Sequence, residues 1–449
     1  MKNSVALAAM ALALTAPGAV MAKSKSAGPS TSEQLSAAQQ QIDALKAQLD
    51  ALQARMDQQA QIQAQAADTA QAAAAKADQA MAKADAASAE VAKPAKIPDA
   101  VKWAADTKIS GRMYFNISTV TAENAAGANV QKDGGFQIKR FYVGIDHKFN
   151  KVFSGNITID VDNVIKSASL STTSSGGNLT GASLSTSPVG QGLYIKKAYL
   201  EAKLDPAFIV RAGSTDMPWI PYVEGLYGYR HIEKTIADLN SFGTSADWGV
   251  HVMGSFADGL VSYQVSAIDG GGYRNPQFTK TVDLEGRISL KYKGFNVGIG
   301  GYTGKLGKDV QGATTFHTAN RFNAALAYKG ELSEIPFTIG GEYFYAKNWN
   351  RVTSVTEDSS DGYSLFASVQ PVKQWSVFGR YDWVKPSKDL APLQKDQYFN
   401  VGIQYSPAKI VDLALVYKRD KGDGGVKTGN LGTGQATRDE IGLYGQFRF

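Results

Sequence analysis

Polar and apolar residues alternate along most of the chain, most clearly at its C-terminal end. One alternating set is apolar and the other is polar: Ile441, Leu443, Phe447 and Phe449 against Glu440, Gln446 and Arg448. Successive side chains of a β-strand point to opposite faces, so one face can meet lipid while the other meets water. The pattern predicts a transmembrane strand that ends on an aromatic side chain.

Fifteen earlier segments between residues 107 and 438 repeat this alternation, which brings the predicted total to sixteen strands. The predicted strands are 108–120, 136–147, 153–164, 194–204, 208–214, 248–256, 261–269, 284–292, 295–304, 320–329, 336–346, 361–370, 375–384, 396–406, 410–419 and 439–449. Most are near the roughly ten residues that a tilted transmembrane strand requires. Their even number fits an antiparallel barrel.

The connections between these strands fall into two alternating classes. Short turns occupy 148–152, 205–207, 257–260, 293–294, 330–335, 372–374 and 407–409. The other connections are long and include 165–193 and 215–247. Because an open sheet would leave backbone groups unpaired in hydrocarbon, the strands must close. The sequence therefore predicts an all-β transmembrane barrel of sixteen antiparallel strands over residues 107–449, with short turns in the periplasm.

A helical pattern precedes the strands. Apolar residues recur three and four positions apart from Leu35 to Met56, and alanines continue the register to Val91. This heptad pattern predicts a periplasmic α-helical coiled coil over residues 35–92. For residues 60–92, a single alanine-rich helix or a disordered linker fits almost as well. Pro94 and Pro98 mark a linker over residues 93–106.

The N-terminus has the pattern of a secretory signal. Lys2 is followed by an apolar run from Val5 to Ala16, and Ala22 ends a small-residue cleavage motif. The run is shorter than the roughly 20 residues that span a bilayer, which disfavours a membrane anchor. Residues 1–22 are predicted to be a signal peptide, and residues 23–34 a flexible N-terminus.

Composition and charge narrow the function further. The chain has no cysteine, 45 glycines, 20 tyrosines and 19 phenylalanines, with a formal net charge of +6. Disulfides and thiolate metal sites are thereby excluded, and no basic motif points to nucleic acid. The four histidines show no metal spacing, and no nucleophile elbow or phosphate loop occurs. We expect no enzyme activity, no cofactor and no metal.

Several strand motifs resemble a known family. Phe136–Asp146 and Gly155–Asp160 are similar to the second and third strands of the phosphate-selective porin O and P family, and shorter matches follow in the same order at 197–201, 210–213, 217–218 and 247–250. The resemblance implies a trimeric, sixteen-stranded porin that passes anions such as phosphate or pyrophosphate. It also implies that Arg140 belongs to a ladder of lumen arginines. The family's lysine cluster is reduced here to Lys305 and Lys308.

Alternation assigns a set of basic side chains to the lumen, where they could bind anions. The candidates are Arg112, Arg140, Lys197, Arg211, Arg287, Arg321 and Arg380. Guanidinium groups suit phosphate because their planar donors match its oxygens. Carboxylates such as Asp160 and Glu201 share this face, so salt bridges that stiffen the wall are an equally good interpretation. Lys139 should point to the face opposite Arg140.

The long connection 215–247 is rich in rigid and polar groups. Its candidate constriction residues are Trp219, Tyr222, Arg230 and Lys234. Long loops are often functional, and this one could fold inward and narrow the pore; an outer lid is the alternative.

Together these features predict a porin in the bacterial outer membrane, with its stalk in the periplasm. The expected partners are small inorganic or organic anions, outer-membrane lipid and two further copies of the chain in a homotrimer. The alternative is a structural barrel whose coiled-coil stalk tethers the membrane to peptidoglycan.

Overall fold

The computed structural model describes residues 31–91, 99–175 and 178–449. The chain divides into two compact units, Met1–Ile97 and Pro98–Phe449, which are considered separately below. The predicted signal peptide lies outside the described residues, as do residues 23–30 of the predicted flexible N-terminus and 93–98 of the predicted linker.

The first unit contains one long helix, α1 (Thr31–Val91), of 61 residues. Its apolar positions are left open to solvent in the single chain: Leu45, Leu49 and Leu52 are 62–64% exposed. A helix confirms the helical part of the prediction, whereas its association into a coiled coil stays a prediction. None of the helices in the described part of the chain is long and apolar enough to cross a bilayer.

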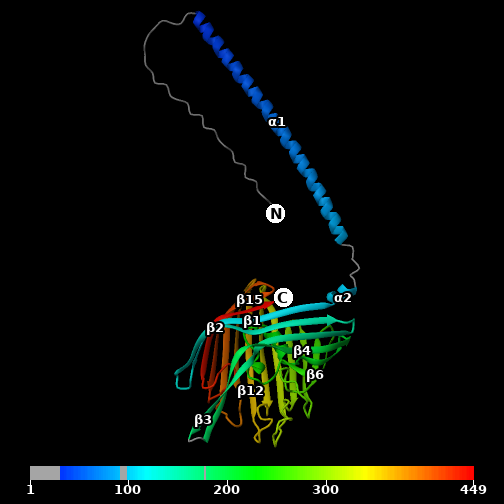
Figure 1. Cartoon of the computed structure of the whole chain (residues 1–449), viewed down its shortest axis with the longest axis vertical. Helices are drawn as coiled ribbons and strands as arrows, with labels where there is room; N and C mark the ends of the chain where they lie inside the picture. Colours follow the sequence, from blue (N-terminus) through cyan, green and yellow to red (C-terminus); the bar gives the residue numbers. More distant parts are fainter. Residues whose placement is uncertain (1–30, 92–98, 176–177) are drawn as a thin grey trace. The chain divides into compact units, whose positions relative to one another are not determined.

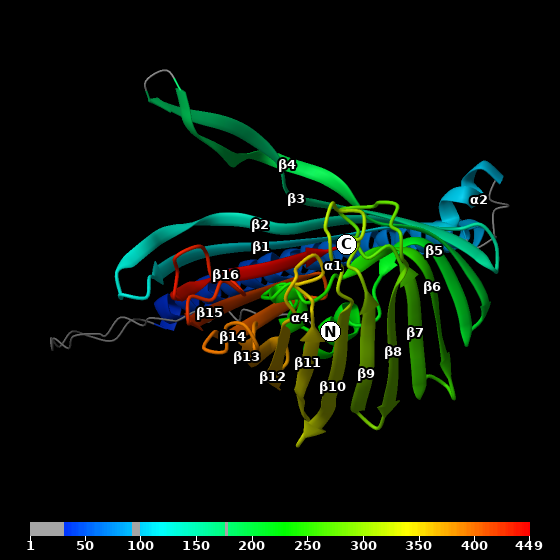
Figure 2. The ribbon, with the colours of Figure 1, turned by 90° about the horizontal axis from the view of Figure 1, so that it is seen from below.

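The second unit starts with a short helix, α2 (Asp99–Ala105), and continues as a closed barrel of sixteen antiparallel strands (Figures 1 and 2). The strands are β1 (Thr107–Glu123), β2 (Asn129–Lys148), β3 (Phe153–Ser175), β4 (Asn178–Asp205), β5 (Phe208–Asp216), β6 (Ala246–Phe256), β7 (Val261–Ile268), β8 (Asp283–Tyr292), β9 (Phe295–Gly304), β10 (Ala319–Leu332), β11 (Ile335–Lys347), β12 (Ser359–Val372), β13 (Trp375–Lys385), β14 (Lys395–Ala408), β15 (Val411–Asp423) and β16 (Thr437–Arg448). The predicted strand number and closure are confirmed.

The first and last strands close the barrel. β1 pairs with β16 from Arg112 opposite Arg448 to Glu123 opposite Thr437. Alternation then separates the two faces: Ile441 is 55% exposed on the outside, whereas Tyr444 is fully buried on the inside. This arrangement satisfies the backbone groups of β1 and β16 and leaves no edge.

The short turns lie where the sequence places them, each joining an even-numbered strand to the next odd-numbered one. Lys293 and Gly294, between β8 and β9, both have positive φ, 45° and 86°. Two residues of this conformation form the hairpin turn that matches the twist of the flanking strands.

One long connection of the prediction is wrong. Most of residues 165–193, expected to form a loop, extend β3 and β4 into a paired hairpin that runs beyond the neighbouring strands (Figure 2). The pairing continues from Ile165 opposite Gly190 to Ser175 opposite Asn178. The segment is rich in Ser, Thr and Gly and has no apolar face, so alternation gives no sign of its strands.

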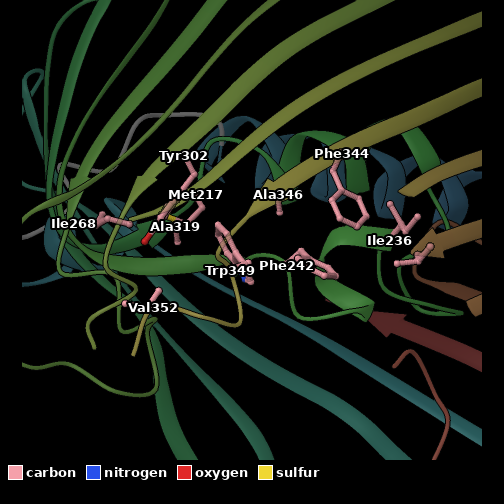
Figure 3. Close-up of a cluster of buried hydrophobic side chains, with 11 residues drawn as sticks. Met217, Ile236, Phe242, Ile268, Tyr302, Ala319, Phe344, Ala346, Trp349 and Val352 are labelled. Carbon is pink, nitrogen blue, oxygen red and sulfur yellow. The ribbon is translucent and has the colours of Figure 1, made fainter. Parts of the chain in front are cut away.

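A cluster of buried side chains fills part of the barrel interior (Figure 3). Met217, Ile236 and Phe242 come from the connection between β5 and β6, and they pack against residues that include Phe344 on β11 and Trp349 in the loop after it. The Phe242 and Phe344 rings lie 4.7 Å apart. This connection is therefore part of the interior core.

Candidate functional site

The connection between β5 and β6 folds into the barrel, and residues 217–245 are called the inner loop below. The inner loop contains α3 (Ile220–Tyr227) and α4 (Ile236–Leu239), which contact β11 and β12 (Figure 2). Trp219 and Ile232 are completely buried. An inward loop of this kind reduces the open cross-section of the barrel.

Trp219 anchors the start of the inner loop. Its backbone N–H donates to a Glu285 carboxylate oxygen at 3.0 Å, and its indole Nε1–H donates to Glu342 at 2.6 Å. Glycines on β9 make room for the loop: a Cβ on Gly300 would lie 2.8 Å from the Trp219 ring, and one on Gly298 would lie 2.4 Å from the ring of Tyr222. The wall is shaped to receive these two aromatic side chains.

The polar residues of the inner loop also pair with one another. The Arg230 Nε–H donates to Glu224 at 2.6 Å, and its guanidinium lies 3.7 Å from Asp238. Burial lowers the pKa of Arg230, but Glu224 and Asp238 outweigh it and raise the pKa above the ordinary value. Lys234 lies 3.9 Å from Asp238 and is more exposed. Arg230 is thus charged and fixed in place.

Basic side chains of the wall hold the inner loop from the opposite side. Arg321 on β10 pairs with Glu285 at 2.9 Å and donates to the Phe242 carbonyl. Arg380 on β13 pairs with Asp382 and donates to the carbonyl of Lys234. In both cases the guanidinium is almost fully buried and has a carboxylate beside it, so it serves mainly to fix the loop.

A single backbone carbonyl accepts hydrogen bonds from two lysines, one on each side of the junction between β1 and β16. Lys139 on β2 and Lys418 on β15 each donate to the Ile232 carbonyl at 2.7 Å. Lys418 also pairs with Glu233 at 3.0 Å. The tip of the inner loop is therefore bound to strands on both sides of the β1–β16 junction.

The inward position of Lys139 corrects the expectation that it faces away from Arg140. Tyr114 pairs with Arg140 and Phe115 pairs with Ile138, so Lys139 is an extra residue in the ladder. Such a β-bulge breaks the alternation and lets two successive side chains point to the same face. Both basic residues of the pair consequently enter the lumen.

A second bulge does the same on β4. Thr158 pairs with Lys197 and Ile159 pairs with Ile195, which leaves Lys196 as the extra residue. The Lys196 ammonium lies 3.4 Å from the Tyr142 hydroxyl and 4.7 Å from the centre of its ring. Alternation alone places only Lys197 inside, whereas the structure places both lysines there.

These lysines line a cavity of about 720 Å³, called the turn-side cavity, between the inner loop and strands β1–β5. Its charged lining residues are Lys108, Arg112, Lys196, Lys197, Arg230, Lys409 and Arg448, against Asp146, Asp216 and Glu224. Asp216 is bound to Lys197 at 3.0 Å, and Glu224 is bound to Arg230. Basic groups therefore outnumber acidic groups in the lining.

A second cavity of about 570 Å³, the loop-side cavity, is lined by Arg140, Tyr273, Arg274 and Arg321 among others. Arg140 pairs with Asp160 at 3.0 Å, and both Arg140 and Arg274 donate to the hydroxyl of Tyr194. The Arg274 guanidinium lies 4.7 Å from the Tyr194 ring centre. Tyrosine thus orients basic groups in both cavities.

The seven predicted basic residues divide into two groups. Five are bound to a carboxylate: Arg140 to Asp160, Lys197 to Asp216, Arg211 to Glu201, Arg321 to Glu285 and Arg380 to Asp382. Arg112 and Arg287 form no ion pair with any described residue. Arg112 lies 3.2 Å from the Tyr114 hydroxyl, and Arg287 donates to the Pro218 carbonyl at 2.8 Å. The salt-bridge interpretation therefore applies to most of the set.

Sequence reasoning missed Lys139 and Lys196 because bulges carry no alternation signal. A usable sign was adjacency: each lies beside a second basic residue within a strand, at Lys139–Arg140 and Lys196–Lys197. The glycines at 298 and 300 were a further sign, because two glycines on one face of a strand leave space for a docked loop.

Two titratable groups at the tip of the inner loop have displaced pKa values. Burial lowers the pKa of His231 to about 3, and the nearby Lys139 adds to the effect. Burial opposes ionisation of Glu233, yet Lys418 and Lys139 hold its pKa well below the ordinary value. The tip therefore carries a neutral imidazole and an ionised carboxylate at neutral pH.

The described part of the chain offers no group of three or more His, Asp or Glu side chains arranged to hold a metal ion.

The barrel is similar to solved outer-membrane channels. The anion-selective porin from Comamonas acidovorans superimposes with a TM-score of 0.53 at 12% identity, covering 76% of this chain and 99% of that one. The outer-membrane channel DcaP of Acinetobacter baumannii (TM-score 0.49, 14% identity, 76% and 97% covered) and OmpF of Salmonella typhi in complex with daunomycin (0.49, 11%, 76% and 97%) are also similar. No family model matches the chain, and no curated protein matches its sequence. The first likeness shows the porin fold.

Proposed function

We propose that the protein is an outer-membrane porin through which small anions diffuse passively. The closed barrel supplies a continuous wall with an apolar outside and a polar inside. The inner loop narrows the lumen, and the turn-side cavity extends along one side of it. This arrangement fits passage of small solutes rather than catalysis, and it needs no cofactor.

The observation that carries the anion preference is the excess of basic side chains in the turn-side cavity. Lys196 and Arg112 line it without an ion pair to any described residue, and both are oriented by tyrosine hydroxyls. The bulge at Lys196 adds a charge that regular pairing would send outward. In a narrow pore with low-dielectric walls such charges attract anions more strongly than they do in bulk water.

Passage would proceed by several weak contacts. An anion would meet Arg140 and Arg274 in the loop-side cavity, pass Arg230 of the inner loop, and leave along Lys196 and Lys197. Because tyrosines and carboxylates already share these cations, no single site binds tightly. Weak, distributed binding is what rapid conduction requires.

Phosphate and pyrophosphate are the solutes we propose within this class, on the strength of the resemblance to the phosphate-selective porins. The pairing of Lys196 with Lys197 and the proximity of Arg112 support a multivalent anion. The seven predicted basic residues remain candidates, with Arg112 and Lys197 placed best because both line the turn-side cavity.

The experiment is reconstitution of the purified protein in planar bilayers. In a tenfold KCl gradient the reversal potential should indicate anion selectivity, and added phosphate should reduce the chloride current in a saturable way. Glucose at the same concentration is the control. A cation-selective reversal potential would refute the proposal.

We also propose that the chain is a homotrimer with a periplasmic coiled-coil stalk. Its support is the 61-residue helix whose leucines at 45, 49 and 52 lack a covering partner in the single chain. The same helix supports a second role, tethering the membrane to peptidoglycan. Sedimentation of the stalk with isolated peptidoglycan tests that role separately from conduction.

A further inference from the structure

Two buried carboxylates face each other at the outer ends of β14 and β15. Asp396 and Asp420 are each 2% exposed, and the Oδ2 atom of each lies within 3 Å of the point where a Cβ on Gly429 would stand. Two carboxylates cannot donate a hydrogen bond to each other unless one takes up a proton. Their juxtaposition therefore needs a compensating positive charge.

The loop between β15 and β16 closes over this pair. The Thr428 hydroxyl donates to Asp396 Oδ2 at 3.0 Å, and the Asn430 backbone N–H donates to Asp420 Oδ2 at 2.7 Å. Between them Gly429 has a φ of +62°, and a Cβ there would lie 2.6 Å from Asp420 Oδ2 and 2.9 Å from Asp396 Oδ2. Only the Oδ2 atoms are satisfied by these contacts.

The remaining oxygen of each carboxylate has no partner. Asp396 Oδ1 and Asp420 Oδ1 are both buried without a hydrogen bond. A buried, unpartnered carboxylate oxygen is costly, because buried polar atoms normally have a hydrogen-bond partner and buried charges are normally paired or bound to a metal ion.

Several other buried acids in this barrel have an arginine or lysine beside them: Asp382 with Arg380, Glu233 with Lys418, Glu285 with Arg321, Asp412 with Arg448, and Glu440 with Arg438. Asp247, Asp283, Asp309 and Glu342 are buried without an ion pair to any described residue, but in none of these cases do two neighbouring carboxylates each keep a buried oxygen without a hydrogen bond. Within the described residues, Asp396 and Asp420 have no such ion pair. A cation that balances this pair would have to come from outside the described residues.

We propose that Asp396 and Asp420 bind a calcium ion. Calcium takes six to eight oxygen ligands in a flexible geometry, so two carboxylates can be completed by hydroxyl, carbonyl and water oxygens. Magnesium requires stricter octahedral geometry and gives up its waters reluctantly. The absence of nitrogen and sulfur donors from this pair disfavours zinc.

A calcium ion here would connect the loop between β15 and β16 with the inner loop. The Asn430 side chain donates to Glu233 at 3.3 Å, and Glu233 belongs to the tip of the inner loop. The proposal stands independently of the solute that crosses the pore, since it concerns the outer ends of β14 and β15.

The test is equilibrium dialysis of the purified full-length protein, stripped with EGTA, against radioactive calcium. We expect one ion per chain, with a dissociation constant of about 10⁻⁴ to 10⁻³ M, the range of extracellular calcium modules. Asp396→Asn and Asp420→Asn should each weaken calcium binding at least about tenfold. Loss of a residue that only supports a metal ligand already lowers metal affinity about tenfold or more, so loss of a ligand itself should cost at least as much. Asp423→Asn is the matched control, because Asp423 lies on the same strand but pairs with Lys395 at 3.0 Å.

A second measurement needs no ligand variant. Tyr398 is the cross-strand neighbour of Asp420, so tyrosine-sensitised terbium luminescence should appear in the wild type and fall in Tyr398→Phe. Calcium should displace terbium, and equal magnesium should displace far less. The proposal would be overturned if no calcium bound at 5 mM, or if binding were unchanged in both asparagine variants. Either result would mean that a proton shared by the two carboxylates supplies the compensating charge.

Discussion

Lys196 shows how one side chain can alter the charge of a pore without any change in composition. Its ammonium rests against the Tyr142 hydroxyl and ring inside the turn-side cavity. Regular pairing would send the same residue into lipid, where a lysine is unfavourable. The bulge therefore removes a cost on one face and adds a positive charge on the other.

Lys196→Gln should reduce anion selectivity. A unit charge about 4 Å from a passing ion contributes about 1 kcal/mol even in water-like surroundings, which corresponds to about a fivefold fall in the anion-to-cation permeability ratio. The ratio follows from reversal potentials in a KCl gradient. Lys151→Gln is the control, because Lys151 is an exposed residue of the β2–β3 turn. Equal ratios in the two variants would contradict the role of Lys196.

The buried imidazole of His231 gives a pH dependence of stability. Its folded pKa of about 3 lies below the ordinary value of 6.5. As pH falls below 6.5, the unfolded chain takes up a proton that the folded chain excludes, so stability decreases down to about pH 3. Above 6.5 both states are neutral and the group contributes no pH dependence.

We expect the thermal midpoint of unfolding to fall between pH 7 and pH 5. This fall should be smaller in His231→Gln than in the wild type. From pH 6.5 to 5 the expected loss is about 2 kcal/mol. Other groups also titrate in this interval, so the difference between His231→Gln and the wild type is what isolates this histidine. An identical response in His231→Gln would show that the imidazole is not the cause.

At the scale of elements, the inner loop is the part whose position decides the open cross-section. Trp219 joins it to β8 and β11 through Glu285 and Glu342. Its ring fills space that Gly300 leaves on β9. Loss of this side chain should free the start of the loop while leaving the strand ladder intact.

Trp219→Ala should therefore raise single-channel conductance and current noise. The change leaves a cavity and removes the indole donor to Glu342, whereas the backbone donor to Glu285 remains. The cost is about 3–5 kcal/mol for a fully buried tryptophan. Planar bilayer recording and urea titration measure the two effects. Trp375→Ala, at a tryptophan that is 47% exposed, is the control. Unchanged conductance in Trp219→Ala would show that the loop does not constrict the passage.

The sequence was sufficient for the strands that cross lipid, because bilayer contact imposes alternation on every such strand. It was insufficient for the β3–β4 hairpin at 165–193, where both faces are polar and apolar residues do not alternate with polar ones. It also failed at Lys139 and Lys196, since a bulge is set by the register of two strands rather than by either sequence. Ion pairs such as Arg321 with Glu285 join residues on different strands, and alternation places both inside without pairing them.

At the scale of the whole molecule, the helix and the barrel are separate compact units. The barrel's hydrogen-bonded strands close on themselves without any contribution from residues 31–91. Its stability should therefore not depend on α1.

A variant that lacks residues 23–98 and keeps the predicted signal peptide should still insert and conduct with unchanged selectivity. Reconstituted single-channel current measures conduction, and sedimentation velocity measures the number of chains per particle. Fewer than three chains with normal conductance would assign trimer formation to the helix. Loss of conductance in a correctly folded variant would contradict the independence of the two units.

The Ile232 carbonyl accepts one hydrogen bond from Lys139 and another from Lys418, which lie on opposite sides of the β1–β16 junction. Both bonds can exist only after the last strand of the chain has met the first. The pair of hydrogen bonds is therefore complete only when the barrel has closed. In a partly inserted intermediate the tip of the inner loop would lack these bonds and would be accessible to protease.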